Sequence, residues 1–444
     1  MRHAERKAGL EALLLRFQPL WRPQPFKIET PDWCGRHPAL THALLGLDDA
    51  HVGALETDTQ ALIAWLTPHL PDLAELTRLI TFPAPVARGE TAGEAGRLFT
   101  DIPGRKQAQI VAYAAALGAP RAPLLEWCAG KGHLGRLLAH RWHWPVTSLE
   151  IDPALCAGGE ALARRAQVDC MQHFVTADAL ADGSDRHLAG RHAIALHACG
   201  DLHTHLIRHA VARHSPALDL APCCYYRTTG ETYRAFNPTD LTLNHDDLRL
   251  AVTETVTASA RQRQRSRQAL AWKLGWVEWR KAVTGESGYR SFPPVPESWL
   301  RGDFPTFIER MKTRCLPAPP TPFPEGAGCA AEQDPPGGRS AQSKCSPELH
   351  EGWATVPQGQ ASPPLARYEA LGQSRAQRML RLQLPRLAFR RALETWLVMD
   401  MAVYLETHGY AVEVTEFCPA ALTPRNLLLS ARRYNPETSP KDRP

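Results

Sequence analysis

The spacing of apolar residues along the chain changes from a helical pattern to an alternation of strands and helices. In residues 1–100, apolar side chains recur at helical spacing, as in Leu10, Leu13 and Leu14, which predicts a mostly helical region. Further along, short apolar runs alternate with helical patterns. We expect strands at residues 124–127, 146–150, 173–176, 193–197 and 218–220. This alternation predicts a parallel sheet with helices on both faces.

The C-terminal part of the chain has its own pattern. Residues 244–281 predict one long helix, residues 392–410 a second one, and residues 411–418 and 426–431 two strands. We therefore expect five segments: a helical accessory region at 1–100, the main part of an α/β domain at 101–255, a helical insertion at 256–316, a linker at 317–364, and a closing helix and strand pair at 365–434. The linker is rich in proline, glycine and serine, which predicts disorder.

Composition narrows the class of protein. The 444 residues leave room for two or three domains, and 44% apolar and 22% charged residues are typical of a soluble globular protein. No apolar run reaches the roughly 20 residues of a membrane span, and the first residues lack the apolar core of a signal peptide. Eleven cysteines without a repeating spacing indicate reduced thiols. We therefore expect a cytoplasmic protein that does not associate with membranes.

The segment 124–139 carries the clearest chemical pattern. The acid Glu126 lies in the first strand, and Gly130 and Gly132 permit a sharp turn into the next helix. The spacing Gly130-x-Gly132-x-x-Gly135 fits the dinucleotide fingerprint, so a nicotinamide-dependent oxidoreductase is one alternative. However, the carboxylate of Glu126 would repel a pyrophosphate and attract a sulfonium. The order acid, x, small, x, Gly, x, Gly resembles the first motif of class I S-adenosylmethionine-dependent methyltransferases, with Cys128 where glycine is commoner.

Further acids follow successive predicted strands. Glu150 ends the second strand and is placed to accept from ribose hydroxyls, with Asp152 as a substitute, and Asp178 follows the third strand near the expected adenine amino group. The predicted cofactor-binding residues are Glu126, Cys128, Ala129, Gly130, Gly132, Glu150, Asp152 and Asp178.

The fourth and fifth strands end in unusual segments. His197-Ala198-Cys199-Gly200 follows one strand, and Pro222-Cys223-Cys224-Tyr225 follows the other. Together with the glycine stretch, these segments resemble a methyltransferase-like family that includes the eukaryotic transfer-RNA 2'-O-methyltransferase of the acceptor stem and the glutathione S-transferase C-terminal domain-containing protein. The resemblance covers roughly residues 100–255. It implies a seven-stranded, Rossmann-like class I sheet that the closing helix and strand pair completes, with S-adenosylmethionine as cofactor and RNA, including transfer RNA, as the leading acceptor class.

The cysteines permit three interpretations. They can hold zinc, attack a base as a nucleophile, or line a tight pocket in which Tyr225 contacts the acceptor. Adjacent cysteines are a poor tetrahedral chelate, so the pattern favours the pocket and no metal is expected. The predicted catalytic residues are His197, Cys199, Cys223, Cys224 and Tyr225.

Two arginine clusters bear on the partner, since a net charge of +5 does not indicate nucleic acid by itself. One cluster lies near three tryptophans that either stack on bases or pack in a core, and the second lies further along the chain. The clusters comprise Arg261, Arg263, Arg265 and Arg267 near Trp272, Trp276 and Trp279, and Arg375, Arg378, Arg381, Arg386, Arg390 and Arg391. We therefore predict a methyltransferase that acts on RNA, with a non-catalytic S-adenosylmethionine-binding or RNA-binding scaffold as the alternative.

Overall fold

The computed structural model describes residues 1–83, 98–99, 102–253, 260–316 and 364–434. The chain divides into two compact units. Unit 1 comprises Met1–Pro23, Asp32–Ala258 and Gln383–Pro444, and unit 2 comprises Gln24–Pro31 and Ser259–Leu382. The linker that we predict to be disordered lies outside the described residues, apart from residue 364. In the described part of the chain, none of the helices combines the length and apolar character needed to cross a bilayer.

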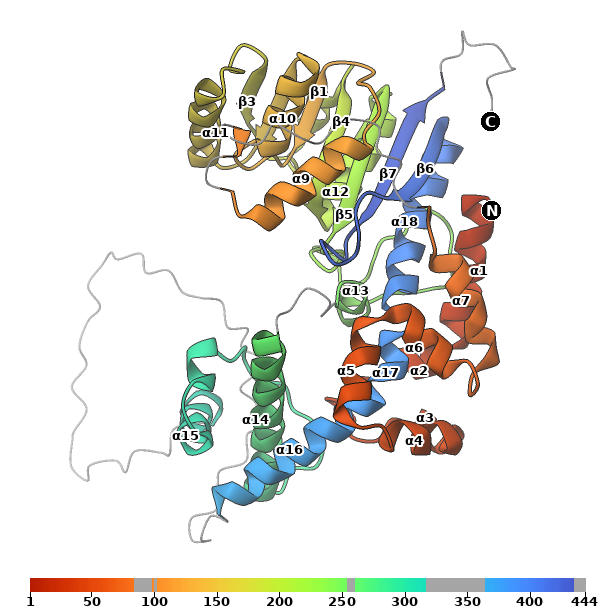
Figure 1. Cartoon of the computed structure of the whole chain (residues 1–444), viewed down its shortest axis with the longest axis vertical. Coiled ribbons are helices and arrows are strands. Elements are labelled where there is room, and N and C mark those ends of the chain that lie inside the picture. The colour runs from red at the N-terminus through yellow and green to blue at the C-terminus, as the bar shows by residue number, and fades with distance from the viewer. Residues whose placement is uncertain (84–97, 100–101, 254–259, 317–363, 435–444) are drawn as a thin grey trace, which may run out of the picture. The chain divides into compact units, whose positions relative to one another are not determined.

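The N-terminal region of unit 1 is helical, as predicted. Its α-helices are α1 (His3–Arg16), α2 (Gln18–Trp21), α3 (Trp33–Arg36), α4 (Pro38–Leu45), α5 (Asp49–Thr57), α6 (Thr59–Leu66) and α7 (Ala74–Ile80). Asp58 separates α5 from α6, because its side chain accepts the N–H of Ala61 at 2.9 Å and so caps α6. Helix α1 packs against α18 (Arg390–Thr407) from the other end of the chain (Figure 1). The N-terminal helices therefore support a helix of the closing segment.

A seven-stranded sheet organises the rest of unit 1. Its strands are β1 (Leu124–Trp127), β2 (Val146–Glu150), β3 (Gln172–Thr176), β4 (His192–Cys199), β5 (Ala217–Cys223), β6 (Tyr410–Glu416) and β7 (Leu427–Arg433). They lie in the order β3-β2-β1-β4-β5-β7-β6, with β1 to β5 parallel and β7 antiparallel to both its neighbours. The predicted α/β class, with a C-terminal strand pair completing seven strands, is therefore confirmed.

Helices connect and cover this sheet (Figure 1). The remaining helices in the described part of unit 1 are α9 (Gly104–Ala116), α10 (His133–Trp142), α11 (Pro153–Arg165), α12 (Asp201–Ala212), α13 (His245–Ala251) and α17 (Leu384–Leu387), with short 3-10 helices at Pro71–Leu73 and Ser184–Leu188. The apolar faces of α9 and α10 join β1 in one buried cluster, as Ile110, Leu137 and Leu124 illustrate. Burial of this cluster fixes the glycine segment between β1 and α10 in place.

A buried ionic network joins the closing strand β7 to the parallel part of the sheet. Asp219 of β5 is fully buried and accepts from His192 Nε2 at 2.6 Å and from Arg432 Nη2 at 2.9 and 2.8 Å. Burial alone would raise the pKa of the Asp219 carboxyl, but the hydrogen bond from His192 and the charge of Arg432 outweigh it and lower that pKa. Side chains of β4, β5 and β7 thus form one hydrogen-bonded network.

Unit 2 is a small helical body made by α14 (Ala260–Thr284), α15 (Phe304–Cys315) and α16 (Leu365–Leu382), with a 3-10 helix at Glu297–Leu300. The prediction of one helix over residues 244–281 is wrong. Helix α13 ends at Ala251, and the β-branched residues Val252 and Thr253, which follow it, are not helical. Helix α14 then begins at Ala260.

The tryptophans of α14 form the core of unit 2. Trp272, Trp276 and Trp279 are at most 4% exposed, so they cannot stack on bases. The second arginine cluster is partly internal as well. Arg375 is buried beside Glu278, and Arg390 of unit 1 is buried against Thr59. Of the two interpretations that the sequence left open, packing in a core is therefore the one that holds for these tryptophans, whereas Arg261, Arg263 and Arg265 are exposed.

The network around Asp219 predicts a specific loss of stability. Replacing Arg432 by Met leaves the buried Asp219 carboxylate without its arginine partner, so we expect the free energy of unfolding to fall by about 3–5 kcal/mol in urea titrations. The matched control is Arg433→Met, because the neighbouring Arg433 is exposed and donates to the carbonyl of His214 at 3.3 Å. The control should change stability by less than about 0.5 kcal/mol. Equal losses in the two variants would contradict this role of the network.

Candidate active site

The turn between β1 and α10 uses left-handed backbone conformations. Gly130 and Gly132 have φ of +58° and +61°, a region that glycine enters without strain. A Cβ atom at Gly132 would collide with the side chains of Gln172 and Phe174, whereas Gly130 faces open space. Gly132 is therefore required for packing, and Gly130 leaves room for a ligand to approach the backbone.

Glu150, at the end of β2, fixes this turn. Its Oε2 accepts the N–H of Gly130 at 2.8 Å, and its Oε1 accepts the N–H groups of Ile151 at 2.9 Å and Asp152 at 3.2 Å. A carboxylate has about four acceptor positions, so these three bonds leave one for a ligand hydroxyl. Glu150 can therefore hold the turn and bind a ligand at the same time.

A cavity of about 580 Å³ lies at the carboxyl ends of the parallel strands. Cys128, Glu150, Asp178 and Cys199 line it, from the ends of β1, β2, β3 and β4. Strand order reverses between β1 and β4, which is the place where sheets of this kind bind ligands. The cavity therefore combines acceptor groups with the expected position of a ligand site.

Glu126 lies behind the glycine turn, outside the lining of this cavity. It is 4% exposed, and its Oε2 accepts from Ser148 Oγ at 2.7 Å and would meet a side chain at Gly135 of α10. Burial raises the pKa of the Glu126 carboxyl to about 7, although the hydrogen bonds from Ser148 and the main chain of Gly135 lower it in part. Its visible contacts are therefore those of a group that joins β1 to α10.

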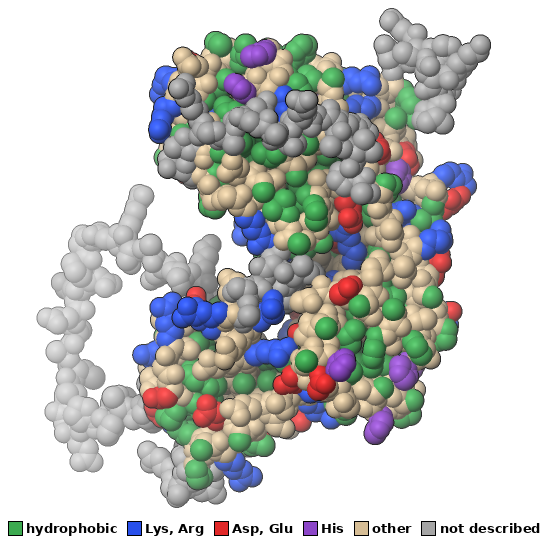
Figure 2. All heavy atoms as spheres, viewed as in Figure 1, with side chains coloured by type: hydrophobic (Ala, Val, Ile, Leu, Met, Phe, Trp, Pro, Cys, Tyr) green, Lys and Arg blue, Asp and Glu red, His purple; other side chains and the backbone are tan. Residues whose placement is uncertain are grey.

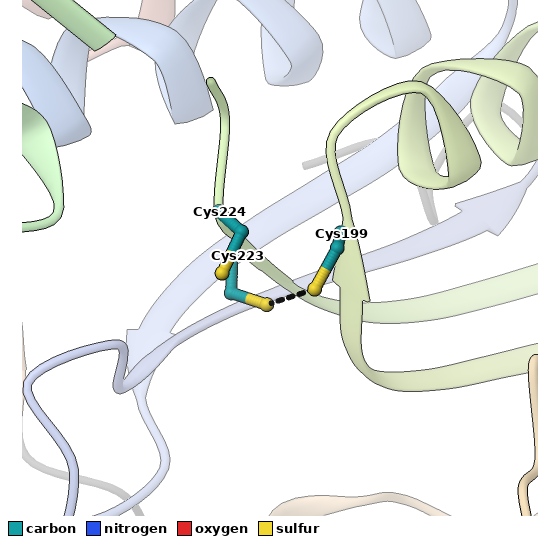
Figure 3. Close-up of side chains that lie close together, drawn as sticks. All are labelled: Cys199, Cys223 and Cys224. Carbon is teal, nitrogen blue, oxygen red and sulfur yellow. Dashed lines mark hydrogen bonds between the residues drawn. The ribbon is translucent and has the colours of Figure 1, made fainter. Parts of the chain in front are cut away.

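Two backbone irregularities bring three cysteines together. The register of β4 against β5 shifts at His197, whose φ is +63°, and Cys199 then lies opposite Cys223. The Sγ atoms of Cys199 and Cys223 are 3.1 Å apart (Figure 3). Cys224 has a φ of +44°, which takes the chain out of the strand, and its Sγ lies within 4.8 Å of the other two. The three thiols thus converge beside the cavity that Cys199 lines.

Hydrogen bonds among the three thiol groups shift their pKa values in different directions. Hydrogen bonds from Cys223 and Cys199, together with the charges of Arg227 and Arg425, outweigh burial and lower the pKa of Cys224 to about 5. The hydrogen bond with Cys223 also lowers the pKa of Cys199, while these hydrogen bonds and burial raise the pKa of Cys223. We therefore expect the metal-free cluster to carry a thiolate at neutral pH.

His197 and Tyr225 lie outside the lining of the 580 Å³ cavity. The Nε2 of His197 is 3.1 Å from Oε1 of Gln109, and burial lowers the pKa of its imidazole to about 4, so the ring is neutral at neutral pH. Tyr225 is buried and packs edge to face on His203 with ring centroids 5.4 Å apart. Its hydroxyl has no hydrogen-bond partner among the residues that the structure describes.

Part of the sequence resembles a known protein family. Residues 106–231 match a protein family that is described as a methyltransferase domain. This segment is a methyltransferase domain. The order of the seven strands is typical of class I methyltransferases, so the cofactor of the methyltransferase domain is S-adenosylmethionine. No curated protein matches the chain.

Two solved structures resemble parts of the chain. One is geranyl diphosphate methyltransferase in complex with GPP and sinefungin, at 17% identity and a TM-score of 0.24, covering 31% of this chain and 54% of that one. The other is geranyl diphosphate C-methyltransferase from Streptomyces coelicolor A3(2) in complex with Mg²⁺, geranyl diphosphate and S-adenosyl-L-homocysteine, at 13% identity and a TM-score of 0.19, covering 33% and 62%. The chain therefore covers less than two thirds of the length of either protein.

The methyltransferase domain brings some of the predicted site residues together and separates others. Cys128, Glu150, Asp178 and Cys199 share the cavity, while Cys223 and Cys224 adjoin it through the thiol cluster. The other predicted residues have different positions. Ala129, Gly130 and Gly132 form the turn, Glu126 lies behind it, Asp152 caps α11 by accepting the N–H of Ala154 at 2.8 Å, and His197 and Tyr225 lie outside the lining.

Two exposed apolar side chains are among the residues of the cavity lining that the sequence did not single out. Ile151 and Leu180 line it and are 61% and 39% exposed, high values for large apolar side chains. Each follows a predicted site acid closely, Ile151 directly after Glu150 and Leu180 two residues after Asp178. Their proximity to these acids was the available signal, because an apolar residue beside an acid that binds a ligand can contact the flat ring of the same ligand.

The buried position of Glu126 predicts a pH dependence of stability. Its folded pKa of about 7 lies above the reference value of 4.5, so the native state binds more protons between these values. Stability is therefore fully present below about pH 4.5 and is lost as pH rises through 7, by on the order of 3 kcal/mol. Glu126→Gln should remove this loss, measured as the difference in unfolding free energy between pH 5 and pH 8.

The control for that measurement is Glu160→Gln, because Glu160 is exposed on α11 and should leave the wild-type pH dependence unchanged. If Glu126→Gln shows the same loss of stability as the wild type, the Glu126 carboxyl does not titrate in this range.

Proposed function

We propose that the protein transfers the methyl group of S-adenosylmethionine to RNA. The proposal rests on the methyltransferase domain and its cavity, which lies where the strand order reverses between β1 and β4. Cationic side chains lie near the same carboxyl ends of the strands. The segments at the ends of β4 and β5 resemble those of a family that includes a transfer-RNA methyltransferase, and this resemblance supports RNA as the acceptor. We also propose a cytoplasmic location. We propose the five sequence ranges as domains, with the α16 part of the last range, Leu365–Leu382, belonging to unit 2.

The residues that line the cavity suggest an orientation for the cofactor. We assign one ribose hydroxyl to Glu150 and the adenine amino group to Asp178, with Ile151 and Leu180 on the walls beside the ring. The open space at Gly130 then lies next to the methionyl part of the cofactor. A cavity of about 580 Å³ is within the usual range for a ligand of this size.

Methyl transfer requires alignment more than acid or base strength. The sulfonium is already activated, so the protein mainly has to hold the acceptor atom in line with the methyl group. A ribose hydroxyl would also have to lose its proton, and His197 is neutral and able to accept one. His197, Cys199, Cys223, Cys224 and Tyr225 remain our candidates for groups on the acceptor side.

Positive charge near the site favours a polyanionic acceptor. The charges of Lys106 and Arg425 act on His197, and those of Arg227 and Arg425 act on Cys224, so all three cations lie near the ends of β4 and β5. Lys106 and Arg227 are exposed and can approach phosphates. On the face shown in Figure 2, the Lys and Arg side chains form separate patches. We therefore assign the phosphate contacts first to this local group.

The cofactor assignment predicts a loss of affinity in Glu150→Gln. Removing the charge weakens the hydrogen bond to the ribose hydroxyl, so we expect the dissociation constant for S-adenosylhomocysteine to rise by about 30-fold, equivalent to about 2 kcal/mol. Isothermal titration calorimetry measures this dissociation constant. Glu160→Gln on α11 is the control and should bind as the wild type does. Unchanged affinity in Glu150→Gln would reject the ribose assignment.

The RNA assignment predicts labelling of RNA and a salt effect. With methyl-labelled S-adenosylmethionine and total RNA, label should enter ribonuclease-sensitive material. Lys106→Ala should raise the apparent KM for RNA by about 3–10-fold at low salt and reduce the salt slope by about 0.7, without changing the affinity for S-adenosylhomocysteine.

Arg121→Ala is the control for Lys106→Ala, because the exposed Arg121 precedes β1 at the opposite edge of the sheet. Equal effects of the two substitutions would reject a local phosphate contact. Cofactor binding without label in any RNA would favour the scaffold alternative instead.

A further inference from the structure

We propose that Cys199, Cys223 and Cys224 bind a thiophilic divalent ion of the zinc type at the edge of the cofactor cavity. The sulfur atoms of these residues lie within 4.8 Å of one another. The proposal goes beyond methyl transfer, because it depends on the sulfur geometry and not on the acceptor that is methylated. It also replaces the expectation, drawn from the sequence, that no metal binds here.

The backbone removes the objection that adjacent cysteines are a poor chelate. Successive side chains of a strand point to opposite faces, so Cys223 and Cys224 could not face one ion from a regular strand. Strand β5 ends at Cys223, and the left-handed conformation of Cys224, with φ of +44°, turns the chain there. The three sulfur atoms consequently lie near one point (Figure 3).

A second irregularity supplies the third sulfur. The register shift at His197 places Cys199 directly opposite Cys223 across β4 and β5. His197 is not a glycine, yet it has a φ of +63°. Such conformations cost of order 1–3 kcal/mol each and cluster at functional sites. Both strained residues, His197 and Cys224, serve the same convergence of thiols.

The sulfur separations suit a tetrahedral ion. With metal–sulfur distances of about 2.3 Å, sulfur ligands of a tetrahedral zinc ion are about 3.8 Å apart. The sulfur atoms of Cys199 and Cys223 are 3.1 Å apart, and no pair among the three sulfur atoms is more than 4.8 Å apart, so no pair has to approach by more than about 1 Å to reach this value. Small side-chain rotations therefore suffice to bind the ion.

The surroundings suit the charge and the chemistry of the site. Three thiolates and a divalent ion carry a net charge of −1, and the charges of Arg227 and Arg425 act on this cluster. Thiolate ligands select soft ions such as zinc over magnesium or calcium. Three protein ligands leave a fourth position of the ion free, as in catalytic zinc sites. Because Cys199 lines the cofactor cavity, the ion would border that cavity.

The experiment is a cobalt titration of the full chain, purified without a polyhistidine tag, treated with a chelator and kept reduced without oxygen. Cobalt(II) is the probe, because thiolate ligands give it charge-transfer absorption. We expect this absorption to saturate at one equivalent and to disappear on addition of Zn²⁺. Mass spectrometry of metals in the untreated protein should find about one zinc per chain.

Matched variants identify the ligands. Cys224→Ser changes a half-buried residue at a strand end and should weaken cobalt binding by at least about 100-fold. Cys170→Ser changes an exposed cysteine outside the cluster and should leave binding unchanged. Circular dichroism of the metal-free variants checks that each is folded, and Cys199→Ser provides a second ligand variant if Cys224→Ser is not.

Three outcomes would overturn the proposal. They are absence of charge-transfer absorption at one equivalent, equal binding by folded Cys224→Ser and wild type, and an intact mass that shows a Cys199–Cys223 disulfide in protein purified under reducing conditions. None of these readouts needs turnover. A failed titration with intact methyl transfer therefore rejects only the metal site, and failed transfer with an intact cobalt site rejects only the proposed function.

Discussion

Left-handed backbone at the ends of the parallel strands is the constraint on which the candidate site depends. A regular strand directs successive side chains to opposite faces, so it cannot bring neighbouring residues to one ligand. In this chain the backbone leaves the strand conformation at Cys128 after β1, at His197 within β4 and at Cys224 after β5, each with positive φ. Burial of β1 and β5 on both faces holds these conformations in place. The cavity and the thiol cluster both follow from this arrangement.

Sequence patterns were sufficient to predict the strands of the sheet, because each strand is a short apolar run that is followed by a turn. They were insufficient where the deciding contact is distant in the chain. Arg432 pairs with Asp219 across 213 positions, and Arg390 donates to Thr59 across 331, so neither pairing can be read from local spacing. For the same reason, arginines that look like a basic surface in the sequence are partly internal ion pairs and hydrogen bonds. Arg375 is buried and Arg261 is exposed, and composition does not distinguish these two positions.

The candidate site was predictable to the extent that it depends on strand ends. Glu150 and Asp178 were placed by the rule that ligands bind beyond the carboxyl ends of parallel strands, and both line the cavity. The direction of a side chain at such an end was not predictable. Glu126 lies in β1 and faces α10, where Gly135 makes room for it, so the carboxylate that favoured S-adenosylmethionine in the sequence is buried behind the turn.

Charge is distributed unevenly along the carboxyl edge of the sheet. Glu150 and Asp178 follow β2 and β3, whereas Arg227 follows β5 and Arg425 lies between β6 and β7. In the strand order β3-β2-β1-β4-β5-β7-β6, the two acids assigned to the cofactor therefore lie on one side of the point between β1 and β4 where the strand order reverses, and these two arginines lie on the other side, where Asp201 after β4 also lines the cavity. A cationic cofactor and an anionic acceptor would each meet opposite charge if they approached from these two sides. The methyl group would then pass between them at β1 and β4, where Cys128 and Cys199 line the cavity, so the thiol cluster borders the path of the proposed transfer.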